Sequence, residues 1–204
     1  MRNFGESDAT PEGSTFGDLE ANDVIGAAET VAARAPGLPV VALGCSMGGA
    51  SVVQAAARGA RLAAVVTDSA FGSSRDVAVP FVMAATGWPR LVVVPFVWSA
   101  EHLHGVPLGR GRTLEAARRV PAAVRALVIE NEGDPIVSVA AARTLAATLP
   151  NAETWITAAP AADHPLVGSQ GAFGMHCQSY KLDPGAYVAR VTSFLDAALP
   201  HPAQ

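Results

Sequence analysis

The sequence predicts an α/β fold in which a mostly parallel sheet is covered by helices on both faces. Short apolar runs alternate along the 204 residues with segments whose apolar positions recur at a helical period. Each run is continuously apolar, which is typical of a strand buried on both sides in a parallel sheet. The length fits one domain, so we expect residues 1–204 to share a single fold.

The expected elements follow one another in regular order. Residues 1–16 are polar and marked by glycine and proline, which predicts a loop. Four strands are expected, at 39–43, 63–67, 126–130 and 153–157. The expected helices lie at 17–35, 47–58, 137–149 and 185–199, with a shorter helical piece near 113–119. This alternation predicts right-handed crossovers between parallel strands.

Residues 72–121, between the second and third expected strands, interrupt this order. The segment looks irregular, with apolar patches, and we interpret it as a small cap inserted within the domain. Its long apolar stretch, 77–100, contains three prolines and Arg90, which break any simple membrane-spanning helix. We therefore expect no membrane span.

The composition excludes several classes of function. Half of the residues are apolar and 16% are charged, which is typical of a globular chain. A net charge of −4 gives no basic footprint for nucleic acid. Two cysteines are too few for a disulfide framework and no cysteine–histidine cluster indicates zinc, so no metal or cofactor is expected. The first residues show no apolar leader, which favours a cytoplasmic location unless a signal precedes them.

The motif at 44–49, Gly-Cys-Ser-Met-Gly-Gly, directly follows the expected strand at 39–43 and precedes an expected helix. A strand, Gly-x-Ser-x-Gly and a helix are typical of a nucleophile elbow, a strained turn that exposes a serine hydroxyl. Ser46 is thus the candidate nucleophile, and the backbone N–H of Met47 is the candidate oxyanion donor. The two flanking glycines are expected to allow tight packing of the turn. A plain strand-to-helix turn is the alternative.

A serine nucleophile needs a base and an acid that orients the base. Asp134 lies in an acidic loop after the third expected strand and is the candidate acid, with helix capping as its alternative role. Glu130, Glu132 and Asp68 compete with it, although Asp68 follows a different strand. Two histidines follow the last expected strand, His176 and His164, and either of them could instead be an ordinary loop residue.

The order Ser46, Asp134, His176 resembles that of the alpha/beta-hydrolase fold family, and the resemblance covers nearly the whole chain. Residues 2–8 are similar to the family's Arg-Gly-x-Gly-x-Ser loop, with Asn3 in place of a glycine. Further similar segments are 16–23, 68–71, 133–137 and the histidine loop with the final helix, 176–195. The last of these resembles small esterase-like members and favours His176 over His164 as the base.

The resemblance also implies that the domain is N-terminally incomplete. Family members carry about four strands before the elbow strand, together with a loop that supplies a second oxyanion donor. Loss of one such donor lowers the rate by roughly 10²–10³. Without the preceding strands, the strand at 39–43 is expected to lie at an edge of the sheet, where self-association through unpaired backbone groups is plausible.

The resemblance therefore predicts a serine hydrolase that cleaves an uncharged or apolar carboxylic ester, a small-molecule acyl compound, through an acyl-enzyme. Acyl transfer, amide or thioester cleavage at the same site, and a non-catalytic module remain alternatives. Cys45 and Cys177 flank the nucleophile and the base, and buried structural cysteines are favoured over a redox role. The aromatic residues of the cap are interpreted as an apolar wall over the site or as ordinary packing. They are Phe81, Trp88, Phe96 and Trp98.

Overall fold

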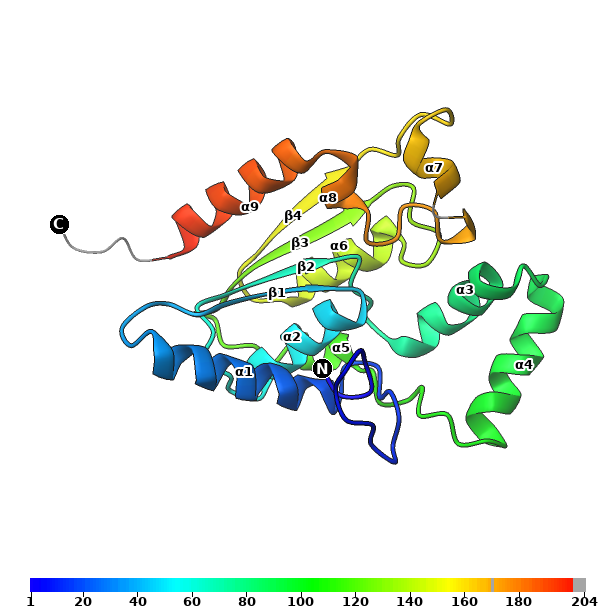
Figure 1. The fold of residues 1–204 in the computed structure, drawn as a ribbon, viewed down its shortest axis with the longest axis horizontal. Helices are drawn as coiled ribbons and strands as arrows, with labels where there is room; N and C mark the ends of the chain where they lie inside the picture. Colours follow the sequence, from blue (N-terminus) through cyan, green and yellow to red (C-terminus); the bar gives the residue numbers. More distant parts are fainter. Residues whose placement is uncertain (170, 200–204) are drawn as a thin grey trace.

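The computed structural model of the protein describes residues 1–169 and 171–199, and it contains one four-stranded sheet (Figure 1). All neighbouring strands pair in parallel, in the same order in space as in the sequence. The strands are β1 (Val41–Cys45), β2 (Ala64–Asp68), β3 (Arg125–Asn131) and β4 (Ala152–Thr157). The predicted strands are confirmed, with β1 beginning and ending two residues later than expected.

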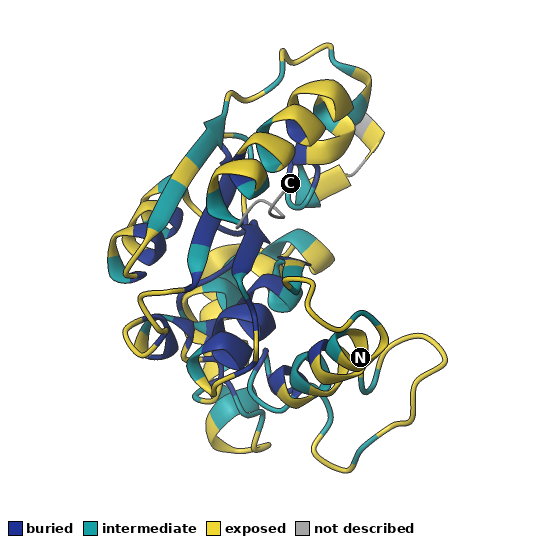
Figure 2. Ribbon diagram, turned by 90° about the vertical axis from the view of Figure 1, so that its left-hand side faces the viewer, coloured by how far each residue is buried: buried dark blue, intermediate teal, exposed yellow. Residues whose placement is uncertain are grey.

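Helices cover both faces of this sheet, as predicted. One face carries α1 (Glu20–Arg34), α2 (Met47–Ala57), α5 (Thr113–Ala117) and α6 (Val139–Thr148). The other face carries α9 (Pro184–Ala198), preceded by the short α8 (Ser179–Leu182). Successive residues of β3 alternate between the two cores: Val128 packs with the first set of helices, whereas Leu127 and Ile129 pack against α9. Figure 2 shows the buried residues concentrated at this central sheet.

The strand β1 lies at an edge of the sheet, as expected from the sequence, because it pairs only with β2. Leu43 on this strand is 55% exposed, whereas every residue of β2 is buried. One side of β1 therefore lacks the packing that a central strand has.

The segment between β2 and β3 contains two 13-residue helices where the sequence led us to expect irregular structure. They are α3 (Ser74–Thr86) and α4 (Arg90–His102), which project beyond the carboxyl ends of the strands (Figure 1). Each helix tolerates an internal proline, Pro80 or Pro95, whose cost is the loss of a backbone hydrogen bond. The boundary lies at Gly87, which ends α3 in the left-handed conformation at φ +70°.

The N-terminal residues 1–19 form a loop that is fixed to the start of α1. The buried carboxylate of Glu20 accepts hydrogen bonds from both the N–H and the hydroxyl of Thr15 and from the N–H of Gly17, at 2.6–2.9 Å. Arg2 also pairs with Asp23 at 2.7 Å. These contacts hold the loop against the same end of the sheet as α3.

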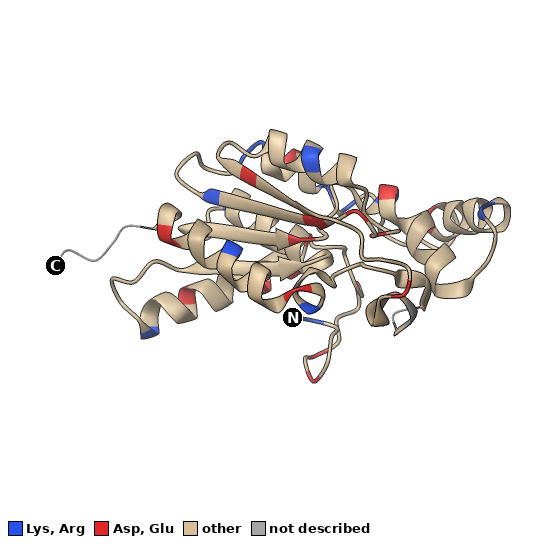
Figure 3. Cartoon of the chain, turned by 90° about the horizontal axis from the view of Figure 1, so that it is seen from above, with Lys and Arg blue, Asp and Glu red and all other residues tan. Residues whose placement is uncertain are grey.

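Three short elements that the sequence did not predict connect β4 to α9. They are α7 (Pro165–Ser169), the 3-10 turn η1 (Gly171–Phe173) and α8. Figure 3 shows charged residues of both signs on helices, loops and strands. Within the described residues, every helix is too short or too polar to cross a membrane.

Candidate active site

The turn between β1 and α2 has the backbone of a nucleophile elbow. Ser46 follows the last residue of β1 and precedes the first residue of α2, and its φ is +51°. Residues other than glycine rarely adopt a positive φ, so the surrounding structure must enforce this backbone conformation. The N–H of Ser46 donates to the carbonyl of Asp68 on β2 at 2.8 Å, which anchors the turn to the neighbouring strand.

Gly44 and Gly49 make this turn possible, whereas the sequence led us to expect tight packing at Gly44 and Gly48. A Cβ on Gly44 would overlap the backbone of Gly48, and a Cβ on Gly49 would lie 2.7 Å from the Cβ of Ala70. A Cβ on Gly48 would meet nothing within 4 Å. The tight packing expected of the two glycines that flank Ser46 therefore belongs to Gly44 and Gly49, because Gly48 faces open space.

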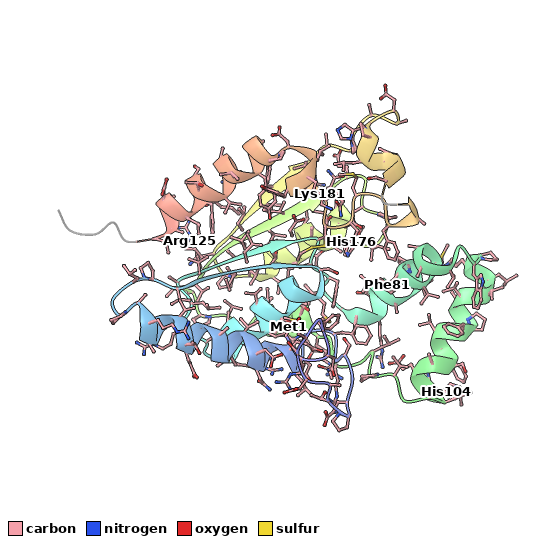
Figure 4. All side chains as sticks on the ribbon, viewed as in Figure 1. Met1, Phe81, His104, Arg125, His176 and Lys181 are labelled. Carbon is pink, nitrogen blue, oxygen red and sulfur yellow. A yellow bond between two sulfur atoms is a disulfide. The ribbon has the colours of Figure 1, made fainter. Side chains whose placement is uncertain are left out.

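The structure brings together the side chains of Ser46, His176 and Asp134. Nε2 of His176 lies 2.9 Å from Oγ of Ser46, and Nδ1 lies 2.8 Å from Oδ2 of Asp134. The carboxylate can only accept, so Nδ1 carries a proton and Nε2 is free to accept the serine proton. The side chain of Asp134 is 0% exposed and that of His176 10%. Figure 4 shows His176 at the carboxyl ends of the strands.

Asp134 uses its second oxygen to fix its own orientation. Oδ1 accepts from the N–H groups of Ile136 and Val137 at 2.7 and 2.9 Å. The cap of α6 is instead Ser138, whose hydroxyl accepts from the N–H of Ala141. Burial alone would raise the pKa of Asp134, but His176 and these two amides outweigh it and hold the pKa below its ordinary value. Asp134 is thus ionised beside the imidazole.

The competing acids occupy different surroundings. Glu132 is exposed, whereas Glu130 is fully buried at the end of β3. Burial, reinforced by the charge of Asp134, raises the pKa of Glu130 from 4.5 to about 9. Because Asp134 has the imidazole and two amides as partners, it holds the negative charge and Glu130 holds a proton at neutral pH.

Asp68 and Ser69, at the end of β2, are hydrogen-bonded to the histidine loop. The N–H of Cys177 donates to Oγ of Ser69 at 3.1 Å, and the hydroxyl of Ser179 donates to Oδ1 of Asp68 at 3.1 Å. Burial raises the pKa of Asp68, although the hydroxyls of Ser179 and Ser69 both donate to its carboxylate. Ser69 was not a candidate from the sequence; its only signal was membership of the segment 68–71.

The second candidate base, His164, lies elsewhere. Its Nδ1 accepts the N–H of Leu166 at 3.2 Å, which caps the start of α7. Only His176, of the two candidates, is hydrogen-bonded to Ser46 and Asp134 within the described residues.

Met47 is the first residue of α2, so its N–H has no acceptor within the helix. This N–H, at the positive end of the helix dipole, is therefore available to an oxyanion that forms when Oγ of Ser46 attacks a carbonyl. The sulfur of Met47 accepts from the hydroxyl of Ser14 at 3.2 Å, which links this turn to the N-terminal loop.

Cys45 and Cys177 form a disulfide across the site. Their Cα atoms are 6.0 Å apart, within the usual range for such a bond. Both residues are only partly buried, so the expected burial of the two cysteines is wrong. The sequence shows that each cysteine adjoins a site residue, but pairing across 132 positions depends on the fold.

A cavity of about 650 Å³ opens beside Ser46 and is almost entirely apolar. Its walls come from the N-terminal loop, the elbow, α3 and α4. The apolar side chains include Phe4, Phe16, Phe71, Val77, Ala78, Phe81, Val82, Phe96, Val97, Ala100, Val106, Leu108 and Ile136. Phe81, labelled in Figure 4, also packs edge-on against Phe173 in η1, with ring centroids 5.5 Å apart.

The four aromatic residues of the cap were interpreted either as an apolar wall over the site or as ordinary packing, and each interpretation holds for two of them. Phe81 and Phe96 line the cavity. Trp88 packs edge-on against the ring of Phe96, and Trp98 stacks on His102 outside the cavity. Among the described residues, no group of three or more histidine, cysteine or acidic side chains is arranged to hold a metal ion.

A parallel sheet with an elbow after one strand and a histidine loop before the last helix defines the alpha/beta-hydrolase fold, and solved structures agree. An esterase from Pyrococcus furiosus superposes with a TM-score of 0.68 at 18% identity, over 96% of this chain and 68% of its own. A meta-cleavage product hydrolase from Pseudomonas fluorescens gives 0.62 at 16% identity, over 98% of this chain and 78% of its own. An esterase from a Rhodococcus species gives 0.56 at 20% identity, over 98% and 79%.

Comparison with protein-family models and with curated proteins gave no match. The likeness to the solved structures, together with the parallel sheet, confirms the predicted fold class. It does not by itself assign a reaction, because one fold supports many.

The contact distances at the glycines predict a contrast between neighbouring substitutions. Gly49→Ala should destabilise the fold by about 1–3 kcal/mol, because the new methyl group must displace Ala70. Gly48→Ala should leave the melting temperature unchanged or raise it, since the methyl group meets open space and alanine favours a helix. Thermal unfolding followed by circular dichroism compares the two variants; equal losses would contradict this account of the turn.

The protonated state of Glu130 predicts a pH-dependent stability difference. Between pH 4.5 and 9 the folded state retains a proton on Glu130 that the unfolded state releases, so the wild type loses stability as pH rises through this window. Glu130→Gln keeps the shape and removes the ionisation. Its melting temperature relative to wild type should therefore increase from pH 5 to pH 9. A difference that stays constant with pH would show that Glu130 does not hold the proton.

Proposed function

We propose that this protein is a serine hydrolase that cleaves uncharged carboxylic esters with an apolar acyl group. The observation that carries this proposal is the hydrogen-bonded chain Ser46–His176–Asp134 beside an apolar cavity that Ser46 lines. Esterases and hydrolases among the structures with the same fold support a hydrolase.

The geometry supports a two-step reaction. Nε2 of His176 takes the proton of the Ser46 hydroxyl while Oγ attacks the carbonyl carbon, and the oxyanion is stabilised by the N–H of Met47. The imidazolium then protonates the leaving alcohol, which yields the acyl-enzyme. Water, deprotonated by the same nitrogen, releases the acid. Asp134 remains ionised throughout and stabilises the charged imidazole, consistent with the depressed pKa of its carboxyl group.

The cavity favours an apolar acyl group for a physical reason. Aliphatic and aromatic side chains surround it, so a charged acyl group would lose its hydration without gaining a partner. An apolar chain gains free energy for each methylene that leaves water. The acyl group is therefore placed between the elbow and the pair α3 and α4.

Active-site labelling tests the nucleophile. A fluorophosphonate probe should modify the wild type at Ser46 and fail to modify Ser46→Ala, because Nε2 of His176 is positioned to take the proton of the Ser46 hydroxyl. Ser193→Ala, which removes an exposed hydroxyl on α9, is the matched control and should label fully. Mass spectrometry of the labelled protein locates the adduct. A folded wild type that resists the probe would refute the proposal.

A series of p-nitrophenyl esters tests the acyl cavity. Each added methylene should raise kcat/KM by up to about fourfold, the factor that corresponds to ~0.8 kcal/mol per buried methylene, until the cavity is full. Ala78→Trp fills part of the cavity and should move the optimum to shorter chains. Ala85→Trp, on the exposed side of the same helix, should leave the optimum in place. An optimum that does not differ between the two variants would place the acyl group elsewhere.

A further inference from the structure

We propose that the Cys45–Cys177 disulfide is a positioning device that holds Ser46 and His176 in register, so that turnover depends on its oxidation. This inference rests on the proposed hydrolase function. Cys45 immediately precedes Ser46, and Cys177 immediately follows His176. The covalent bond therefore joins the two backbone segments that carry the proton donor and the proton acceptor of the first chemical step.

The other contacts of the histidine loop reach the elbow only indirectly, through β2, where the carbonyl of Asp68 accepts the N–H of Ser46. Cys177 bonds to Ser69 and Ser179 to Asp68, both at the end of β2, and the N–H of Met175 donates to the carbonyl of Gly133 after β3. Within the described residues, the Ser46–His176 hydrogen bond is the only one that joins the segment 174–179 to β1 or Ser46. The disulfide is thus the strong link between this loop and the elbow.

The elbow follows an edge strand, so the position of Ser46 depends more strongly on the disulfide. β1 pairs with β2 only, and Leu43 on it is largely exposed, so the strand that carries Ser46 is supported from one side. Ser46 and Cys177 both have a positive φ, +51° and +58°. Non-glycine residues keep a positive φ when the surroundings enforce it, and the disulfide is one such restraint.

Small reductants have a route to the bond. Cys45 lines the apolar cavity, and both cysteines are partly exposed. A dithiol reduces the bond by thiolate attack on one sulfur and closure of its own ring. Two electrons and two protons pass to Cys45 and Cys177, and the reductant leaves as a cyclic disulfide. The contacts of the loop to Ser69 and Asp68 remain, so the reduced protein keeps its fold while Ser46 and His176 lose their common anchor.

The expected effect is on kcat rather than on KM. The cavity walls belong mainly to α3, α4 and the N-terminal loop, which the disulfide does not touch. Misplacement of reacting groups by about 1 Å costs up to roughly 10²-fold in rate. Reduction should therefore lower kcat by about tenfold to a hundredfold and change KM little.

The experiment uses the wild-type chain and dithiothreitol. Ester hydrolysis is followed during reduction, alkylation with mass spectrometry counts the free thiols, and circular dichroism at the assay temperature reports folding. The loss of kcat should track the appearance of two thiols in a folded protein, and reoxidation should restore it. The double variant Cys45→Ser, Cys177→Ser should show the low kcat of the reduced wild type and no response to dithiothreitol.

The outcomes separate this inference from the proposed function. An oxidised wild type that neither hydrolyses esters nor takes the fluorophosphonate probe would remove the proposed function, and this inference with it. An active wild type whose kcat is unchanged when both thiols are free would overturn the positioning role alone. A loss of activity that merely follows unfolding would also overturn it. Should the double variant fail to fold, the reduction and reoxidation of the wild type decide the question.

Discussion

The close approach of α2 to β1 is the contact on which the candidate site depends. With no side chain at Gly44 or Gly49, the first turn of α2 comes close to the end of β1 and to Ala70 after β2. The chain must then reverse within one residue, which forces Ser46 to a positive φ. That conformation turns its Oγ toward His176 and leaves the N–H of Met47 at a free helix end.

Charge is distributed around this turn by differences in hydrogen bonding rather than in burial. Asp68, Glu130 and Asp134 all lie in low-polarity surroundings at the ends of β2 and β3. Asp134 alone combines an imidazole with two backbone amides, so it holds a negative charge that Glu130 cannot hold as well. A neutral Glu130 leaves one carboxylate to polarise His176, which is the arrangement that a base requires.

The sequence predicted the features that depend on local pattern and order. Apolar runs located the strands, and order along the chain singled out Ser46 and Asp134, whereas the choice of His176 over His164 came from the resemblance of 176–195 to a histidine loop and final helix. Prolines misled the assignment of α3 and α4, because each costs one hydrogen bond without ending a helix of 13 residues. Gly48, Ser69 and the disulfide could not be judged, since their roles depend on contacts between segments far apart in the chain.

The two halves of the site are held in different ways. The acid follows β3 and the histidine loop is hydrogen-bonded to the end of β2, and both of these strands are paired on both sides. The nucleophile rests on the edge strand β1, whose pairing is one-sided. Besides the pairing of β1 with β2, relative motion of the two halves is opposed by single hydrogen bonds, from Ser46 to His176 and from Ser46 to Asp68 on β2, each worth about 1 kcal/mol. A covalent bond one residue away on each side restricts that motion where the geometry of proton transfer is most sensitive.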